Sequence, residues 1–125
     1  MTALQHSRPL ALFGLLLANG GQHQGQSLVA PEAIAAIAAG ADPAIYAQDE
    51  DFSHWIPGAS YRSQWYVLND HSRAIVAGGI HGQYLFVDFE SDVVIVKQSS
   101  LPAAVGIFDA DNVRALRAIA AYLKA

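Results

Sequence analysis

Residues 61–102 read YRSQWYVLNDHSRAIVAGGIHGQYLFVDFESDVVIVKQSSLP. Four apolar runs rich in β-branched and aromatic residues follow one another here, separated by short polar or glycine-containing breaks. The predicted strands are Tyr61–Leu68, Ala74–Ile80, Gln83–Asp88 and Val93–Lys97. Because the breaks are too short to hold crossover helices, the four strands are expected to form an antiparallel meander.

Helical patterns precede this meander. Leu10–Ala18 (LALFGLLLA) repeats apolar residues at a spacing of four and is followed by Asn19-Gly20-Gly21, a typical helix stop. Its nine residues are far fewer than the roughly 20 needed to span a bilayer. The segment is compatible with the core of a signal peptide, but a buried helix accounts better for the spacing and the stop.

Two further helices are expected, separated by a long connection. Pro31 stands at a favoured first helical position, which predicts a short helix over Pro31–Ala39. Residues 41–60 read as a long loop with one turn of helix. A last helix begins near Asp109, with an apolar face formed by Val113, Leu116, Ala120 and Leu123. A run of strands beside segregated helices predicts an α+β fold, an antiparallel meander flanked by helices.

Composition excludes several kinds of partner. The 125 residues are 53% hydrophobic and 14% charged, with a formal net charge of −4 and no basic run. Nucleic acid and membranes are therefore not expected as partners. Cysteine is absent, which removes disulfides, thiolate metal sites and a cysteine nucleophile from consideration. This composition is compatible with both the cytoplasm and the periplasm.

The sequence lacks the short motifs that mark an activated nucleophile. Its lysines, Lys97 and Lys124, are preceded three residues earlier by Val94 and Ala121, so there is no Ser-x-x-Lys. A Gly-x-Ser-x-Gly elbow is also missing. The histidines show no His-x-x-x-His spacing, so no metal site is expected. No cofactor is expected either.

The break Gly78-Gly79-Ile80-His81-Gly82-Gln83 is the candidate binding feature. Glycines without Cβ atoms leave room for a ligand to lie against the backbone of a strand. The same pair is also compatible with a β-bulge or a tight turn that has no ligand nearby. His81 invites a role as a general base, although a lone histidine beside a strand is more often a hydrogen-bonded structural residue.

Aromatic residues around the first strand offer a second candidate feature. Trp55, Tyr61, Trp65 and Tyr66 are placed where they can line a substrate cleft. Alternating aromatics on strands are more often core residues or cross-strand pairs, so a core role is favoured.

The meander resembles the C-terminal part of the penicillin-recognising serine hydrolases, the class C β-lactamase-like family. The glycine-containing break, Gln64-Trp65 upstream and Ser99-Ser100-x-Pro102 downstream make it most similar to the branch of 6-aminohexanoate-dimer hydrolases and related esterases. The resemblance implies amide or ester hydrolysis and a β-lactamase/transpeptidase-like fold. It also implies that residues 1–125 form a single partial domain, about the last third of such a hydrolase.

The resemblance also implies roles for individual residues. In that family a strand carrying Lys-Thr-Gly, His-Thr-Gly or Trp-Gly-Gly lines the active site, and the next residue donates a backbone N–H to the oxyanion hole. Ala77-Gly78-Gly79 takes the place of this motif, so Ile80 becomes the oxyanion donor, with Gly78, Gly79 and His81 as substrate-binding residues. Ala77 replaces the lysine of β-lactamases, which favours ester or amide substrates over lactams.

The same resemblance sets expectations for partners. The family's catalytic Ser, Lys and Tyr have no counterpart in this chain, so the chain alone is not expected to hydrolyse anything. A small amide or ester would be its substrate only when an upstream part, or a separate polypeptide, completes the site. An incomplete sheet is expected to form homo-oligomers or to pair with an upstream chain. The alternative is a stand-alone α+β module for binding or assembly, without enzymatic activity.

Overall fold

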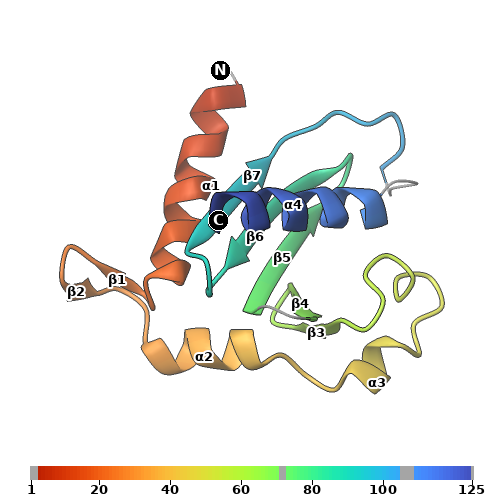
Figure 1. Ribbon diagram of the computed structural model, residues 1–125, viewed down its shortest axis with the longest axis horizontal. Helices are drawn as coiled ribbons and strands as arrows, with labels where there is room; N and C mark the ends of the chain where they lie inside the picture. Colours follow the sequence, from red (N-terminus) through yellow and green to blue (C-terminus); the bar gives the residue numbers. More distant parts are fainter. Residues whose placement is uncertain (1–2, 71–72, 105–108, 125) are drawn as a thin grey trace.

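The computed structural model describes residues 3–70, 73–104 and 109–124 (Figure 1). The elements within these ranges are α1 (Ala3–Ala18), β1 (Gln22–His23), β2 (Gln26–Ser27), α2 (Pro31–Ala39), α3 (Pro43–Tyr46), β3 (Ser60–Arg62), β4 (Trp65–Asn69), β5 (Arg73–Gly79), β6 (Gln83–Asp88), β7 (Val93–Lys97) and α4 (Asp109–Lys124). Strands β3 to β7 form an antiparallel sheet in sequential order. An antiparallel meander flanked by helices confirms the predicted α+β class.

The centre of the sheet is the β5–β6 pair. Its ladder runs without interruption from Ala74 opposite Asp88 to Gly79 opposite Gln83. Successive side chains of β6 alternate between the two faces, so that Phe86 belongs to one core cluster and Val87 to the other. Both are fully buried, which explains why this strand reads as a continuous apolar run rather than an alternating one.

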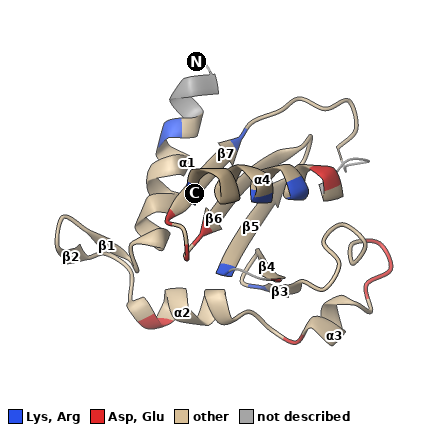
Figure 2. Ribbon diagram, viewed as in Figure 1, with Lys and Arg blue, Asp and Glu red and all other residues tan. Residues whose placement is uncertain are grey.

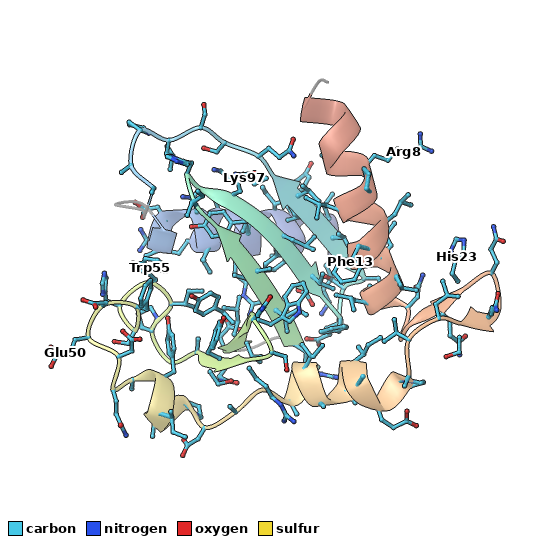
Figure 3. All side chains as sticks on the ribbon, turned by 180° about the vertical axis from the view of Figure 1, so that it is seen from behind. Arg8, Phe13, His23, Glu50, Trp55 and Lys97 are labelled. Carbon is cyan, nitrogen blue, oxygen red and sulfur yellow. The ribbon has the colours of Figure 1, made fainter. Side chains whose placement is uncertain are left out.

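Different helices cover the two faces of the sheet. α4 packs on one face through Val113, Leu116 and Ala120, which are buried at helical spacings of three and four. α1 lies on the other face, and the two views from front and back show these helices on opposite sides (Figures 1 and 3). The placement of Leu123 on the buried stripe is wrong: it is 59% exposed, because the core that α4 covers ends at Ala120.

α1 confirms the predicted helix but buries a narrower face than the spacing suggested. Leu17 is buried, and a Cβ on Gly14 would lie only 2.5 Å from a side-chain carbon of Val94, so the glycine lets the helix approach β7 closely. Leu12 and Phe13 are instead 54% and 45% exposed. The helix therefore presents an apolar surface to solvent as well as to the sheet. Within the described residues, no helix is both long enough and apolar enough to cross a membrane.

The prediction of one continuous strand over Tyr61–Leu68 is wrong. The segment is a hairpin, in which β3 ends at Arg62, Ser63 and Gln64 form the turn, and β4 begins at Trp65. Both turn residues have positive φ, 53° and 68°, as a two-residue turn of the I′ type requires. The usual Asn-Gly signal for such a turn is absent, which hid the reversal.

A second hairpin lies in the polar connection after α1. β1 and β2 pair there around Gln24 and Gly25, which also have positive φ. The helix stop before it is confirmed, since the Gly21 N–H donates to the Leu16 carbonyl at 2.8 Å. The bounds of α2, β6 and β7 agree with the sequence prediction, and α3 supplies the expected turn of helix in the long connection.

Candidate functional site

Gly78 and Gly79 close the regular part of β5. They pair in register with Tyr84 and Gln83, and neither has a positive φ, so the alternative of a β-bulge is wrong. A Cβ on Gly78 would make ordinary contacts, 3.8 Å from the Tyr84 ring and 4.0 Å from the Tyr66 ring. Neither the backbone nor the packing requires glycine at position 78, which leaves an open surface over the strand.

This end of β5 also has an open edge. β4 pairs with β5 only from Asn69 opposite Arg73 to Tyr66 opposite Val76. Residues 77–79 extend beyond that pairing, while their other edge is occupied by β6. Backbone groups on the open edge are therefore available to an extended amide or another polar ligand.

Ile80 follows directly, in the turn that joins β5 to β6. The predicted strand included Ile80, but β5 ends at Gly79. The Ile80 carbonyl accepts a hydrogen bond from the Gln83 side-chain amide at 3.2 Å. Its N–H donates no hydrogen bond within residues 3–70, 73–104 and 109–124. The residue as a whole is 61% exposed, so the turn lies on an accessible part of the surface.

His81 and Gly82 complete the turn and are tied to the loop after β7. His81 has a φ of 62°, unusual for a residue with a side chain. Its N–H donates to the Ala104 carbonyl at 2.9 Å, and its carbonyl accepts from the Leu101 N–H at 3.2 Å. Its Nδ1 lies 2.8 Å from the Leu101 carbonyl, which can only accept, so the proton sits on Nδ1. His81 thus holds the loop in place, and a contact with substrate stays a prediction.

An apolar pocket of about 290 Å³ opens over the glycine pair on the face of the sheet that α4 covers. We call it the glycine pocket. Its described lining residues are Phe52, Trp55, Ile56, Tyr66, Val76, Gly78, Gly79, Ile80, Gly82, Tyr84, Ala104 and Val113. The structure therefore brings Gly78, Gly79 and Ile80 together at one cavity, whereas His81 is not part of the lining.

The far wall of the glycine pocket comes from the long connection between α3 and β3. Phe52 and Trp55 contact each other edge to face, with ring centroids 4.5 Å apart and an interplanar angle of 84°. The Tyr46 hydroxyl donates to the Phe52 carbonyl at 2.7 Å and so anchors the wall from below. Burial, reinforced by the neighbouring Tyr66, raises the pKa of Tyr46 to about 12, so this hydroxyl keeps its proton near neutral pH.

The aromatic candidates divide between the cleft and the core. Trp55 and Tyr66 line the glycine pocket. Trp65 is buried in the core cluster on the opposite face of the sheet, which confirms for this residue the core role favoured from the sequence. The Tyr61 ring lies outside the pocket but packs on Tyr66 at a centroid distance of 4.8 Å. Sequence reasoning missed Phe52, whose signal is an aromatic residue within an otherwise acidic, polar loop.

A second pocket of about 320 Å³ lies on the α1 face of the same strand end. Gly78 and Gly79 line both cavities, so the sheet is thin at this point. Lys97 lines the second pocket, and its ammonium donates to the Gly82 carbonyl at 2.8 Å. The turn is thus supported by Lys97 as well as by the loop that holds His81.

The ionisable groups do not assemble into a metal centre. In the part of the chain that the structure describes, no group of three or more His, Asp or Glu side chains is placed to hold a metal ion. Asp88 is buried but accepts hydrogen bonds from the Glu90 and Ser91 N–H groups at 2.9 and 3.2 Å, and so stabilises a turn. The predictions that the site uses no metal and no cofactor stay predictions.

Comparison with known proteins places this fold in a class. No protein-family model matches the chain. The similarities to characterised sequences and solved structures nevertheless show that it is related to the C-terminal part of the β-lactamase-like serine hydrolases.

Within that class the chain is similar to 6-aminohexanoate-dimer hydrolases. It is 34% identical over 96 residues to the 6-aminohexanoate-dimer hydrolase of Paenarthrobacter ureafaciens, a match that covers 77% of this chain and 24% of that protein. A solved structure from Bacillus anthracis, provisionally assigned as a 6-aminohexanoate-dimer hydrolase, superposes with a TM-score of 0.71 at 26% identity. That superposition covers 94% of this chain and 29% of the other. The chain thus spans 24% and 29% of the lengths of these two relatives, well under a third of each.

Proposed function

We propose that this chain is a C-terminal fragment of an amide- or ester-hydrolysing serine hydrolase and supplies the oxyanion side of its active site. Two relatives share the name 6-aminohexanoate-dimer hydrolase, which describes cleavage of an amide. The chain itself contains no Ser-x-x-Lys. In this proposal the nucleophile comes from a polypeptide segment outside these 125 residues.

The observation that carries the proposal is the glycine pair at the end of β5. Gly78 sits in a regular strand where alanine would fit, yet its open surface faces a cavity. The next residue after the pair, Ile80, has a backbone N–H that donates no hydrogen bond among the described residues. An accessible strand surface followed by an available donor is the arrangement needed to receive a carbonyl group.

The chemistry follows from that arrangement. A substrate amide or ester lies against Gly78 and Gly79 with its carbonyl oxygen directed at the Ile80 N–H. When a nucleophile attacks the carbonyl carbon, negative charge develops on that oxygen, and the N–H donates a stronger hydrogen bond to it. A donor of this kind contributes roughly 3 kcal/mol to lowering a barrier. The second donor, the nucleophile and its base belong to the completing segment.

Labelling with a fluorophosphonate, which modifies activated serines, tests the proposal. The purified chain is expected to remain unlabelled. The native protein, recovered from its source cells with an antibody against this chain, is expected to carry the label on a serine outside these residues. A native species without label, or a label on a serine of this chain, would contradict the proposal.

A stand-alone assembly module is the second candidate, because the structure carries unpartnered apolar surface. β7 pairs with β6 on one edge only, among the described strands, and its residues are all half-buried. Leu10, Leu12, Phe13 and Leu15 on α1 are each more than 40% exposed. Pairing with an upstream chain, or with a second copy, would cover both features. A monomer at micromolar concentration in sedimentation velocity would count against either pairing.

A further inference from the structure

We propose that the glycine pocket selects an uncharged, apolar group, such as an aryl ring or a short alkyl chain attached to the amide or ester. This inference rests on the proposed function, because the substituent is that of a substrate whose carbonyl meets Ile80. It predicts a substrate that differs from the one described by the relatives' name. A linear dimer of 6-aminohexanoate carries an ammonium group at one end and a carboxylate at the other.

The lining of the glycine pocket carries the first part of the argument. The described lining consists of aromatic, aliphatic and glycine residues, with four aromatic side chains among them: Phe52, Trp55, Tyr66 and Tyr84. No lining residue in the described ranges has an ionisable side chain other than the two tyrosines. A charged group entering this cavity would lose its hydration without gaining a partner of opposite charge, which is strongly unfavourable.

Charged groups near the lining residues are committed to local structure. The Lys97 ammonium donates to the Gly82 carbonyl at 2.8 Å and lies 5.8 Å from the centroid of the Tyr84 ring, and Arg114 forms an ion pair with Asp111. Asp49, three residues before Phe52, accepts hydrogen bonds from the Asp51 and Phe52 N–H groups, both at 3.0 Å. Arg117 on α4 binds the carboxylates of Asp70 and Asp88. Figure 2 shows the acidic segment on the outer side of the connection between α3 and β3, at the margin of the molecule. None of these charged groups is a lining residue of the pocket.

The size of the cavity limits the group that fits. An apolar cavity of about 150 Å³ holds one benzene molecule. The glycine pocket, at about 290 Å³, therefore has room for one aromatic ring together with a short linker. Trp55 and Tyr66 offer flat apolar surfaces on different segments of the lining, one from the long connection and one from β4.

Isothermal titration of the unmodified 125-residue chain with three matched amides tests this selectivity. The probes are N-benzylacetamide, its para-carboxylate analogue 4-(acetamidomethyl)benzoate, and its para-aminomethyl analogue, which is a cation at pH 7. We expect N-benzylacetamide to bind at least ~10-fold more tightly than either charged analogue. Equal binding of the three, tighter binding of the cation through the aromatic faces, or no binding of the neutral probe would overturn the inference.

A pair of variants shows whether the binding occurs in this pocket. Gly78→Val places a side chain beside the Tyr66 and Tyr84 rings, and we expect it to weaken binding of the neutral probe at least ~10-fold. Val96→Leu adds bulk on β7 at a residue that packs against the opposite face of the sheet, outside the pocket, and should leave binding unchanged. Equal effects of the two variants would place the probe elsewhere and overturn the inference.

The outcome is distinguishable from that of the labelling experiment. The chain could bind the neutral amide selectively while its native form is never labelled. That result would contradict the hydrolase proposal and support the proposed class of ligand. The native protein could instead be labelled and cleave the charged dimer faster than a neutral amide. That result would support the hydrolase proposal and contradict the proposed class of ligand.

Discussion

The end of strand β5 and the turn that follows it use glycine for different reasons. Gly82 has a φ of 79°, and a Cβ there would lie 2.6 Å from a side-chain carbon of Leu101. Gly78 has ordinary strand geometry, and a Cβ there would meet nothing closer than 3.8 Å. The folded structure itself requires glycine at position 82. At position 78 it does not, and glycine there is explained by a ligand that lies against the open surface of the strand. The comparison separates a structural glycine from a functional one within a single short segment.

The largest expected effect on stability concerns Gly82, the structural glycine of this comparison. Gly82→Ala should lower the free energy of unfolding by about 3 kcal/mol, because it combines a strained left-handed backbone with overpacking against Leu101. Urea denaturation followed by far-UV circular dichroism measures the change.

Gly58→Ala is the matched control, since Gly58 has a similar φ of 82° but a Cβ at this position would meet nothing within 4 Å. It should cost only about 1 kcal/mol, from the backbone strain alone. Combining Leu101→Ala with Gly82→Ala should recover part of the difference in unfolding free energy between Gly82→Ala and Gly58→Ala. Equal costs at the two glycines would show that Leu101 does not restrict the turn.

A smaller effect concerns the wall of the glycine pocket. Tyr46→Phe removes the hydrogen bond to Phe52 and should cost about 1 kcal/mol at pH 8. Because the pKa of Tyr46 is raised to about 12 in the folded state, the folded chain holds this proton more tightly than the unfolded chain. The resulting stabilisation is complete below about pH 10 and is lost as the pH rises towards 12.

Urea denaturation between about pH 8 and pH 11.5 measures this dependence. The stability advantage of the wild type over Tyr46→Phe should shrink across the alkaline half of the range. Tyr122→Phe is the control, because Tyr122 is 82% exposed and its replacement should change little at any pH. An advantage that stays constant to the alkaline end of the range would contradict the assigned role of Tyr46.

The smallest expected effect on stability concerns Gly78, the functional glycine of this comparison. Gly78→Ala should change the free energy of unfolding by less than about 1 kcal/mol and in the stabilising direction, since alanine restricts the unfolded chain without straining the strand. The same denaturation experiment applies. A loss as large as that of Gly82→Ala would mean that Gly78 is structural, and would remove the main support for the proposed site.

Regular elements with strong periodicity were predictable from the sequence. The bounds of α2, β6 and β7 were predicted correctly, because proline, turn residues and β-branched runs mark their limits. The reversals at Ser63-Gln64 and Gln24-Gly25 were not, since three of these four residues carry side chains and yet adopt positive φ. Pairing between strands decides such turns, and local residue preference does not reveal it.

The candidate site was predictable on one side only. The glycine pair stood out because its residues are contiguous and their missing side chains are visible in the sequence. On the opposite wall Trp55 was a candidate for lining a cleft, although a core role was favoured for it. Phe52 and Val113 were not predictable, because Phe52 reaches the cavity through the path of a long connection and Val113 through the docking of α4. Only the folded chain brings these distant segments to the strand end.

Besides strands β4 to β6 and the loop after β7, the lining of the glycine pocket includes three segments that are far apart in sequence: the connection before β3, the β5–β6 turn and α4. A small molecule in the cavity would touch all three, so its binding free energy would oppose their separation. By mass action, ligand at about 100 times its dissociation constant adds about 2.7 kcal/mol to the free energy of unfolding. The abundance of the folded chain in a cell would then depend on the supply of its ligand.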